Sequence, residues 1–323
     1  MSYISNKDRI YVAGHNGLVG GAIVKALTEK GHSNLITRSR SELDLLDVQA
    51  VRVFFKKEKP DVVFLAAAKV GGIHANNTFR ADFIYENIQV QNNVIWNAHL
   101  NGVKRLVFLG SSCIYPRNAE QPIRENALLT GHLEYTNRPY ALAKIAGLEL
   151  VNALRMQHGR DYFSVMPTNL YGPRDNFHPE NSHVLPALVR RFCEAKDANA
   201  EKVIIWGTGT PKREFLYAED CADAIVFLAE NLDTKIFKDS IFENEGWSHI
   251  NIGSGQELSI AELANLISDT VGFKGKIEFD KTKPDGMFRK LLDTTQLKSL
   301  GWEPKTSLRS GISATVDWFL NHY

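Results

Sequence analysis

Short apolar runs alternate with longer amphipathic stretches over the first half of the chain. Each run has the length of a buried strand in a parallel sheet, and the stretches between the runs have the length of helices. The expected strands are Arg9–Ala13, Asn34–Thr37, Asp61–Ala68 and Arg105–Leu109, and the expected helices lie at about 18–30, 81–100 and 140–157, with a further one beginning in Ser41–Asp47. This order predicts β-α-β units around a parallel sheet, which is the α/β class.

Composition and charge narrow the range of partners. The 323 residues are 44% apolar and 23% charged, and the formal net charge is +1. Because this charge is so small, we expect neither nucleic acid nor a membrane surface as a partner. The three cysteines suggest reduced thiols, the first nine residues lack the apolar core of a signal peptide, and no apolar run reaches the ~18 residues of a membrane span. We therefore expect a soluble cytoplasmic protein, and we assign no metal ligands.

A glycine-rich turn follows the first expected strand and precedes the first expected helix. Its glycines recur at every third residue, whereas the usual dinucleotide fingerprint has the spacing G-x-G-x-x-G. The two spacings serve the same purpose, because in both the glycines let backbone N–H groups approach a pyrophosphate at a helix N-terminus. The alternative is a turn that serves helix packing alone. The expected cofactor loop comprises Gly14, His15, Asn16, Gly17, Leu18, Val19 and Gly20.

The second expected strand ends in Arg38-Ser39-Arg40 and carries no carboxylate. An acidic residue near this point takes the ribose 2′-hydroxyl of NAD, whereas arginine accommodates the 2′-phosphate of NADP. Arg38 and Arg40 therefore predict NADP, the alternative being two solvated arginines in a surface loop. The stretch Ser41–Asp47, which includes Leu45, is expected to border the adenine.

Small polar residues follow the strand Arg105–Leu109, at the end of the sheet where α/β proteins hold their ligands. If the chain stays extended there, Ser111 and Cys113 point to the same side, because side chains alternate along a strand. A hydroxyl and a thiol are then expected to face one crevice. The other two cysteines, Cys193 and Cys221, lie in expected helices and are interpreted as small buried apolar residues.

Tyr140 and Lys144 are four residues apart in a helix that opens at Pro139, and they therefore share one helix face. An ammonium close to a phenol is expected to lower the pKa of the phenol, which makes it a usable proton donor and acceptor. Such a pair is often only an amphipathic surface pair. After a complete nucleotide-binding half and a strand that leads to Ser111, it predicts a catalytic pair.

Several longer segments carry a resemblance to a known family; they lie at 66–73, 110–116, 139–147, 166–173, 175–179, 181–184, 206–216 and 283–286. On these segments the chain resembles the extended short-chain dehydrogenase/reductase family over essentially its whole length. It is most similar to the members that convert GDP-4-keto-6-deoxy-D-mannose to GDP-L-fucose, by epimerisation at C3 and C5 and by reduction of the C4 ketone with NADPH. The resemblance implies this activity, this cofactor and a GDP-sugar substrate.

The resemblance also implies roles for single residues. Ser111, Tyr140 and Lys144 match the catalytic hydroxyl, the proton-transferring phenol and the ammonium that tunes it, while Cys113 and His183 match the base and the acid of the epimerisation. His178 lies on the same loop, and spacing does not choose between the two histidines. Lys144 is implied to bind the nicotinamide ribose, and Pro167, Thr168, Asn169 and Leu170 to lie near the nicotinamide. The further implied cofactor contacts are Leu109, Gly110, Ser111, Ser112 and His183, and the implied contacts to the GDP-sugar are Arg191, Trp206, Arg213 and Asp285.

These residue types suit two reactions that both develop negative charge on the same oxygen of the sugar. C3 and C5 both flank the C4 carbonyl, so deprotonation at either carbon and hydride addition at C4 all place negative charge on O4. One pair of donors, Ser111 and Tyr140, can serve that oxygen throughout. Inversion needs a base on one face of the sugar and an acid on the other, as Cys113 and His183 would provide. A thiol becomes a base only when a nearby cation or helix terminus stabilises its thiolate.

The resemblance further implies a Rossmann-type doubly wound sheet with a smaller α/β substrate-binding domain. Residues 1–173, with 215–231 and 249–255 returning to them, are expected to form the NADP-binding domain, and 174–214 with 256–323 the GDP-sugar-binding domain. The later elements expected are helices at 184–194, 219–231, 259–271, 294–300 and 308–321, and strands at 202–206, 249–253 and 276–280. Helices near 83–100 and 140–157 resemble those that pair across a family homodimer as a four-helix bundle.

Two other function classes remain open from the residues. A nucleotide-sugar 4-epimerase or 4,6-dehydratase with tightly held NAD has the same fold, but such a dehydratase carries an Asp-Glu pair where Ser112-Cys113 stands here. A 4-epimerase needs no second acid–base pair, so Cys113 and His183 count against it. A non-catalytic NADP-binding regulator would be expected to lose the tyrosine, the lysine or the glycines, and all of them remain.

Overall fold

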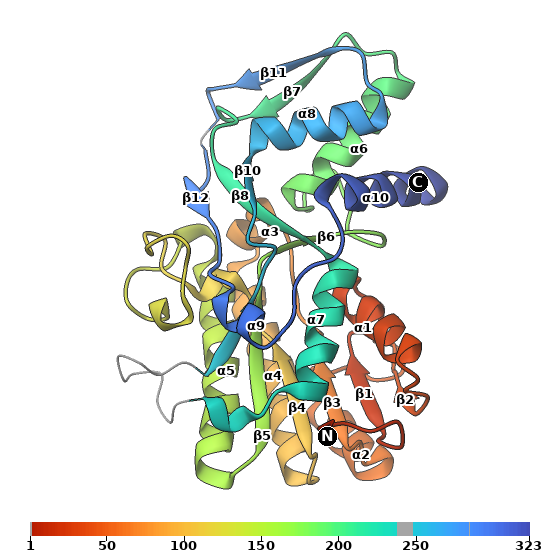
Figure 1. Cartoon of the computed structure of the whole chain (residues 1–323), viewed down its shortest axis with the longest axis vertical. Coiled ribbons are helices and arrows are strands. Elements are labelled where there is room, and N and C mark those ends of the chain that lie inside the picture. Colours follow the sequence, from red (N-terminus) through yellow and green to blue (C-terminus); the bar gives the residue numbers. More distant parts are fainter. Residues whose placement is uncertain (1, 238–247, 284) are drawn as a thin grey trace.

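Six parallel strands form the largest sheet, in the order β2-β1-β3-β4-β5-β9 (Figure 1). The computed structural model describes residues 2–237, 248–283 and 285–323. The strands of this sheet are β1 (Ile10–Ala13), β2 (Leu35–Ile36), β3 (Val62–Leu65), β4 (Arg105–Leu109), β5 (Asp161–Pro167) and β9 (His249–Ile252). Strand β2 lies on one side of β1, and β3 lies on the other side. The direction in which successive strands are added therefore reverses between β1 and β3. Ligands of doubly wound sheets bind at such a reversal, beyond the carboxyl ends of the strands.

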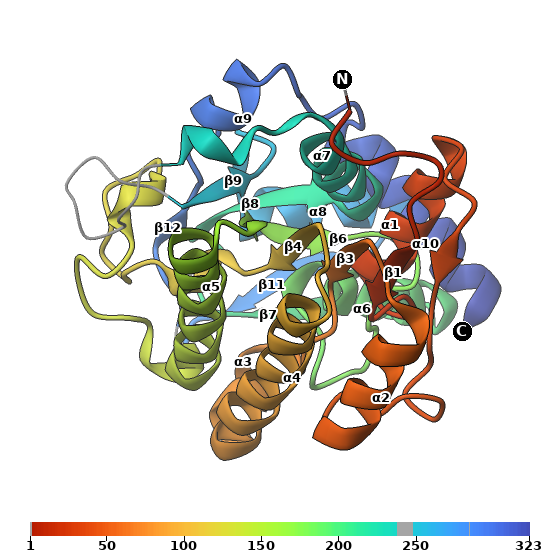
Figure 2. The same ribbon diagram turned by 90° about the horizontal axis from the view of Figure 1, so that it is seen from below.

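Helices cover both faces of this sheet, as the end-on view in Figure 2 shows. Helices α1 (Leu18–Glu29) and α7 (Ala218–Asn231) lie on one face, and α2 (Val48–Glu58), α4 (Arg80–Leu100) and α5 (Arg138–His158) on the other. Each face has its own apolar core, because the strands are buried on both sides. The expected fold class, a doubly wound parallel sheet, is confirmed.

A smaller unit lies beyond the carboxyl ends of the large sheet (Figure 1). Its central strand, β8 (Lys212–Tyr217), pairs with β6 (Asn169–Tyr171), β10 (Glu257–Ser259) and β12 (Arg289–Lys290). A separate parallel pair joins β7 (Lys202–Trp206) to β11 (Lys276–Asp280). Helices α6 (Val184–Asp197), α8 (Ile260–Val271) and α10 (Leu308–His322) share a third apolar core with these strands. The short helices α3 (Ile73–Thr78) and α9 (Thr295–Ser299) complete the α-helices of the described residues.

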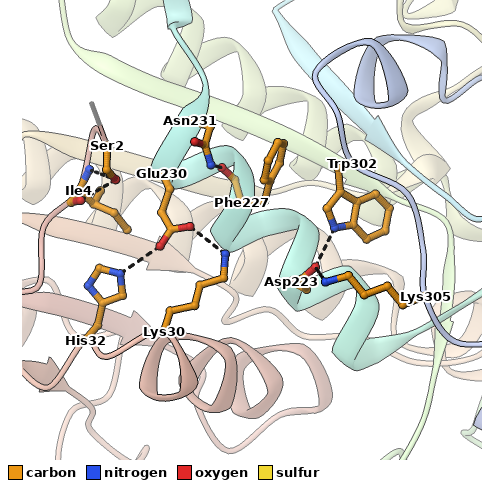
Figure 3. Close-up of polar contacts among 10 residues, drawn as sticks. All are labelled: Ser2, Ile4, Lys30, His32, Asp223, Phe227, Glu230, Asn231, Trp302 and Lys305. Atoms are coloured by element: carbon orange, nitrogen blue, oxygen red, sulfur yellow. Dashed lines mark hydrogen bonds and ion pairs between the residues drawn. The ribbon is translucent and has the colours of Figure 1, made fainter.

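Helix α7 contacts both the segment after α1 and the connection between α9 and α10 (Figure 3). At one end, the Glu230 carboxylate pairs with Lys30 at 2.8 Å and lies 3.3 Å from the ring of His32, both just beyond α1. Further along, Asp223 accepts hydrogen bonds from the Trp302 indole at 2.9 Å and from Lys305 at 3.0 Å. These contacts hold the connection between α9 and α10 against the sheet. The division into two domains stays a prediction; β8 pairs outside the large sheet, whereas α7 packs on α1.

The expected elements differ from the structure in a few places. Ser41–Asp47 does not begin a helix: it forms turns, and the Asp47 carboxylate caps α2 by accepting from the N–H groups of Gln49 and Ala50. Strand β3 ends at Leu65, three residues earlier than expected, because only four of its residues have partners in β1 and β4. The strands β5 and β8 and the short elements α3, β6, β10 and β12 have no counterpart among the expected helices and strands. Among the described residues, none of the helices is both long and apolar enough to cross a membrane.

Candidate active site

The glycine loop packs its backbone tightly between β1, β3 and α1. Gly14 has a φ of +88°, and a Cβ atom there would lie 2.7 Å from the Ala67 backbone nitrogen. A Cβ at Gly20 would lie 2.1 Å from the Gly14 carbonyl oxygen, so α1 could not start this close to the strand with a larger residue. Gly17 is the N-cap of α1 and brings no side chain to its first turn. The N–H groups of that turn are thus available to an anion without a competing side-chain cap. His15 and Asn16 lie in the loop, and Leu18 and Val19 are the first two residues of α1.

The two predicted NADP arginines differ in their surroundings. Arg38 donates to Glu58 at 2.7 Å and to the Thr37 carbonyl, and its guanidinium lies over the ring of Phe54. Arg40 is exposed in the turn that follows β2, and no ion pair holds it within the described part of the chain. Leu45 lies half-buried in the turn before α2, where its carbonyl accepts from Asn93. Arg40 is thus the arginine that is free to meet a phosphate.

The chain does not stay extended beyond β4, contrary to the expectation for Ser111 and Cys113. Residues Ser112–Ile114 form a 3₁₀ turn, and the Ser111 hydroxyl caps it by accepting from the Cys113 N–H at 3.3 Å. The two side chains still meet at one point, because both act on the Tyr140 phenol: Ser111 as a hydrogen-bonding partner and Cys113 through its charge. Their common neighbour, the Tyr140 phenol, is therefore reached through the turn rather than through strand alternation.

Tyr140 and Lys144 lie buried on the face of α5 that meets the carboxyl end of β4. The Lys144 ammonium donates to the Leu109 carbonyl at 2.8 Å and lies 5.9 Å from the centre of the Tyr140 ring. Burial without an ion pair lowers the pKa of Lys144 to about 7. The expected lowering of the pKa of Tyr140 is wrong for this structure: burial raises it, and the Cys113 charge raises it further, against a smaller lowering effect of Ser111. Tyr140 is held in its protonated form.

Two donors not predicted from the sequence reach the sulfur of Cys113. The Asn137 side-chain amide, just before α5, lies 3.3 Å from Sγ, and the Lys290 ammonium, on β12, lies 3.7 Å from it. Lys290 is buried, with 8% of its surface exposed. The cation that a thiolate base requires is therefore present, and it comes from the far end of the chain. Cys193 and Cys221 are buried, and burial raises the pKa of each, to about 11 for Cys193.

The two candidate histidines have different environments. The Nδ1 atom of His178 accepts from the backbone N–H groups of Glu180 and Asn181, at 3.2 and 3.3 Å, so this ring shapes its own loop. His183 is the N-cap of α6, and its side chain is exposed. Desolvation by the surrounding protein atoms and the nearby charge of Lys290 lower its pKa. The loop is held by Gly72, whose N–H donates to the Asn181 carbonyl at 2.9 Å. Lys290 is a neighbour of both His183 and Cys113, whereas the hydrogen bonds of His178 in the described part of the chain stay within its own loop.

The loop after β5 connects the large sheet to the smaller unit. The Thr168 N–H donates to the Ile252 carbonyl of β9, and the Asn169 amide donates to the Glu214 carbonyl of β8. Pro167 ends β5, and Leu170 lies in β6. Beside it Gly110, which precedes Ser111 and the buried Ser112, leaves room for Met166: a Cβ at this glycine would lie 2.3 Å from the methionine sulfur. This loop and the end of β4 border the site from two sides.

The four predicted GDP-sugar contacts gather around the end of β7. Trp206 is 69% exposed, with the Lys283 ammonium 5.5 Å from its ring centre, and Arg191 donates to the β7 carbonyl of Ile204 at 2.9 Å. The Asp285 carboxylate accepts from the N–H and the hydroxyl of Thr208, both at 2.8 Å. Arg213 lies on β8, directly opposite Lys290 in the β8–β12 register. Through this pairing, the residues expected to bind the GDP-sugar are connected to Lys290, whose ammonium lies beside the Cys113 sulfur.

Comparison with known proteins places these features in context. The model of the family described as "NAD dependent epimerase/dehydratase family" matches residues 10–253. The chain is 58% identical to GDP-L-fucose synthase 1 of Arabidopsis thaliana over 323 residues, covering 100% of this chain and 96% of the relative. It is 53% identical to GDP-L-fucose synthase of Escherichia coli (strain K12), covering 98% of each chain. A solved structure of a GDP-L-fucose synthetase from Naegleria fowleri bound to NADP has a TM-score of 0.87 at 29% identity, over 99% of this chain and 96% of that one.

Proposed function

The chain belongs to the NAD dependent epimerase/dehydratase family, and on that basis we propose that it converts GDP-4-keto-6-deoxy-D-mannose to GDP-L-fucose. It would epimerise the sugar at C3 and C5 and reduce the C4 ketone with NADPH. The observation that carries this proposal is the placement of Cys113, with a buried cation beside it, next to Ser111 and Tyr140. A reductase alone needs only the tyrosine, the serine and Lys144, whereas Cys113 and His183 add an acid–base pair.

Epimerisation begins with removal of a proton next to the ketone. The Cys113 thiolate takes the proton from C3 or C5, the electron pair of the broken C–H bond moves into the carbonyl, and negative charge develops on O4. Hydrogen bonds from Ser111 and Tyr140 stabilise that charge. His183 then returns a proton to the opposite face, which inverts the carbon. Because the pKa of His183 is lowered, its protonated ring gives up the proton readily.

Reduction uses the same hydrogen bonds at O4. NADPH, when bound, supplies the hydride to C4. Tyr140 donates its phenolic proton to O4, and the raised pKa of the buried phenol means that this proton is present when it is needed. Lys144 remains beside the phenol, fixed by its hydrogen bond to the Leu109 carbonyl. The reduction therefore depends on groups of β4 and α5 that also serve the epimerisation.

The residues present fit a dinucleotide phosphate. Close packing at Gly14 and Gly20 leaves a backbone cradle at the N-terminus of α1, and the exposed Arg40 suits a ribose 2′-phosphate. Arg38, by contrast, already pairs with Glu58. We therefore expect Arg40 to contribute more than Arg38 to the selection of NADPH over NADH.

Arg40→Ala is expected to raise the KM for NADPH by about tenfold while leaving the KM for NADH nearly unchanged, because only NADPH carries the phosphate. Initial rates with each cofactor measure this. Arg52→Ala, an exposed arginine of α2, serves as the control. An equal effect on both cofactors would remove Arg40 from phosphate recognition.

We also propose that two copies of the chain pair through α4 and α5 in a four-helix bundle. Large apolar side chains are exposed on both helices: Tyr85, Trp96 and Leu100 on α4, and Leu142 and Met156 on α5. Several exposed large apolar side chains on two neighbouring helices are typical of a subunit contact. Light scattering is expected to give twice the 36.3 kDa mass of one chain, and Trp96→Asp is expected to return it to the single mass. A monomeric wild-type protein would contradict this.

The proposed activity is tested by incubating the protein with GDP-4-keto-6-deoxy-D-mannose and NADPH and identifying the sugar by NMR. GDP-L-fucose is the expected product. A reduced sugar that keeps the original configuration at C3 and C5 would show a reductase without epimerase activity, and unchanged substrate would contradict both activities.

The substrate and the free, reduced cysteines are those of a cytoplasmic enzyme, which is the location we propose.

A further inference from the structure

The buried lysine of β12 is not explained by the fold. Lys290 is 8% exposed, and no carboxylate pairs with it in the described part of the chain. A buried ammonium without a counter-ion is costly, so a lysine at such a position normally has a partner in the functional state. Its one hydrogen-bond contact in the described residues is the sulfur of Cys113, at 3.7 Å.

The backbone that follows Lys290 is held in place by two hydrogen bonds. Its neighbour Leu291 donates its N–H to the Gln121 side chain at 2.8 Å, and the N–H of Leu292 donates to the Glu214 carboxylate at 3.0 Å. Lys290 itself pairs with Arg213 in the β8–β12 register. The ammonium thus meets the sulfur without any rearrangement of β12.

A second donor meets the sulfur from another element. The Asn137 amide lies 3.3 Å from Sγ and immediately precedes α5, the helix that carries Tyr140 and Lys144. The small pocket beside the sulfur is lined by Glu134 as well as by Asn137 and Lys290. Glu134 pairs with Arg117 at 3.4 Å and accepts from the Thr136 N–H, so its charge is partly neutralised. The groups that point at the sulfur are therefore both donors.

We propose that Lys290 and Asn137 are positioning residues that hold Cys113 as a thiolate and aim it at the sugar carbon it deprotonates. This inference rests on the proposed epimerisation. The thiolate takes the proton as the C–H bond breaks, the electron pair moves toward O4, and Lys290 stays an ammonium throughout. The same cation lies near His183 and lowers its pKa, so a protonated His183 is a stronger acid and gives up its proton readily.

The test compares Lys290→Met with Lys281→Met, an exposed lysine at the end of β11. The first readout needs no sugar: the rate at which iodoacetamide alkylates Cys113, measured by peptide mass spectrometry from about pH 6 to about pH 9. The Lys290 variant is expected to react at least about tenfold more slowly at pH 7 and to regain the wild-type rate only at higher pH, because the thiol form does not react. Asn137→Ala is expected to show a smaller shift in the same direction, and Lys281→Met none.

The second readout uses GDP-4-keto-6-deoxy-D-mannose in D₂O without cofactor. Deuterium incorporation at C3 and C5 is expected to fall in Lys290→Met by about tenfold more than hydride transfer does, the latter being followed as NADPH formed from GDP-L-fucose and NADP. Methylammonium is expected to restore part of the exchange in Lys290→Ala. An unchanged alkylation profile would overturn the proposal, as would a raised KM with unchanged kcat, which would assign Lys290 to substrate binding.

The proposed epimerisation and the proposed role of Lys290 and Asn137 are tested by different outcomes. If the wild-type protein exchanges no deuterium into the keto-sugar, the proposed epimerisation is wrong, whereas the alkylation profile still decides whether Lys290 and Asn137 hold a thiolate. If Lys290→Met does not fold, as judged by its circular dichroism and melting transition, Asn137→Ala and Lys290→Gln, which also removes the charge, carry the same measurements. A wild-type profile in both of these would then overturn the proposal.

Discussion

Cys113→Ser is expected to lower solvent deuterium exchange at C3 and C5 of the keto-sugar by about 10²–10⁴-fold, the usual contribution of a positioned base. Serine has nearly the size of cysteine and keeps the 3₁₀ turn after β4, but its hydroxyl does not ionise at neutral pH. Hydride transfer between GDP-L-fucose and NADP is expected to fall by less than about tenfold, because Tyr140, Lys144 and Ser111 are unchanged. Exchange is measured by NMR and hydride transfer by single-turnover absorbance.

The control for this variant is Cys193→Ala, which alters a buried cysteine of α6. It is expected to leave the ratio of exchange to hydride transfer unchanged, even if it lowers stability. Equal losses of both activities in Cys113→Ser would remove the cysteine from the role of base. They would indicate instead that the substitution disturbs Ser111, whose hydroxyl caps the same turn.

Tyr140→Phe is expected to lower both activities, which distinguishes it from the cysteine variant. Hydride transfer should fall by about 10²–10⁴-fold, because the buried phenol is the proton donor to O4. Deuterium exchange should fall as well, by at least about tenfold, because the same hydrogen bond stabilises the negative charge on O4 during epimerisation. The phenylalanine ring keeps the contact with Phe83, 6.2 Å away between ring centres, so the helix should stay in place.

Tyr135→Phe is the matched control, since Tyr135 is an exposed tyrosine that lies beside Arg80 and Arg138. Removal of its hydroxyl should change neither activity. A Tyr140→Phe protein that loses hydride transfer but keeps full exchange would show that a different group stabilises O4 during epimerisation. The idea of one shared oxyanion site would then be wrong.

Much of this site could be predicted from local sequence patterns. The glycines of the first turn are identified by their spacing after a strand, and Tyr140 and Lys144 are identified by their spacing on one helix face. Ser111 is predicted as a site residue because it comes directly after an apolar run that forms a strand. Each of these signals lies within a few residues of the chain, where period and turn chemistry determine the geometry.

The remaining groups come together only through tertiary pairing. Lys290 is 177 residues from Cys113 in the sequence, and its approach depends on the pairing of β8 with the two-residue strand β12. Asn137 stands in a polar stretch before α5 and gives no signal of its own. The pKa of Tyr140 was expected to fall because of Lys144, but burial has the larger effect, and burial is not visible in local spacing.

The most direct test of the central claim is to run the complete reaction in D₂O with NADPH and to locate the isotopes in the product by NMR. If one site deprotonates C3 and C5 and then reduces C4, the product is GDP-L-fucose with deuterium at C3 and C5 and with protium, delivered as hydride, at C4. A reduced GDP-sugar with protium at C3 and C5 and the original configuration would contradict the account.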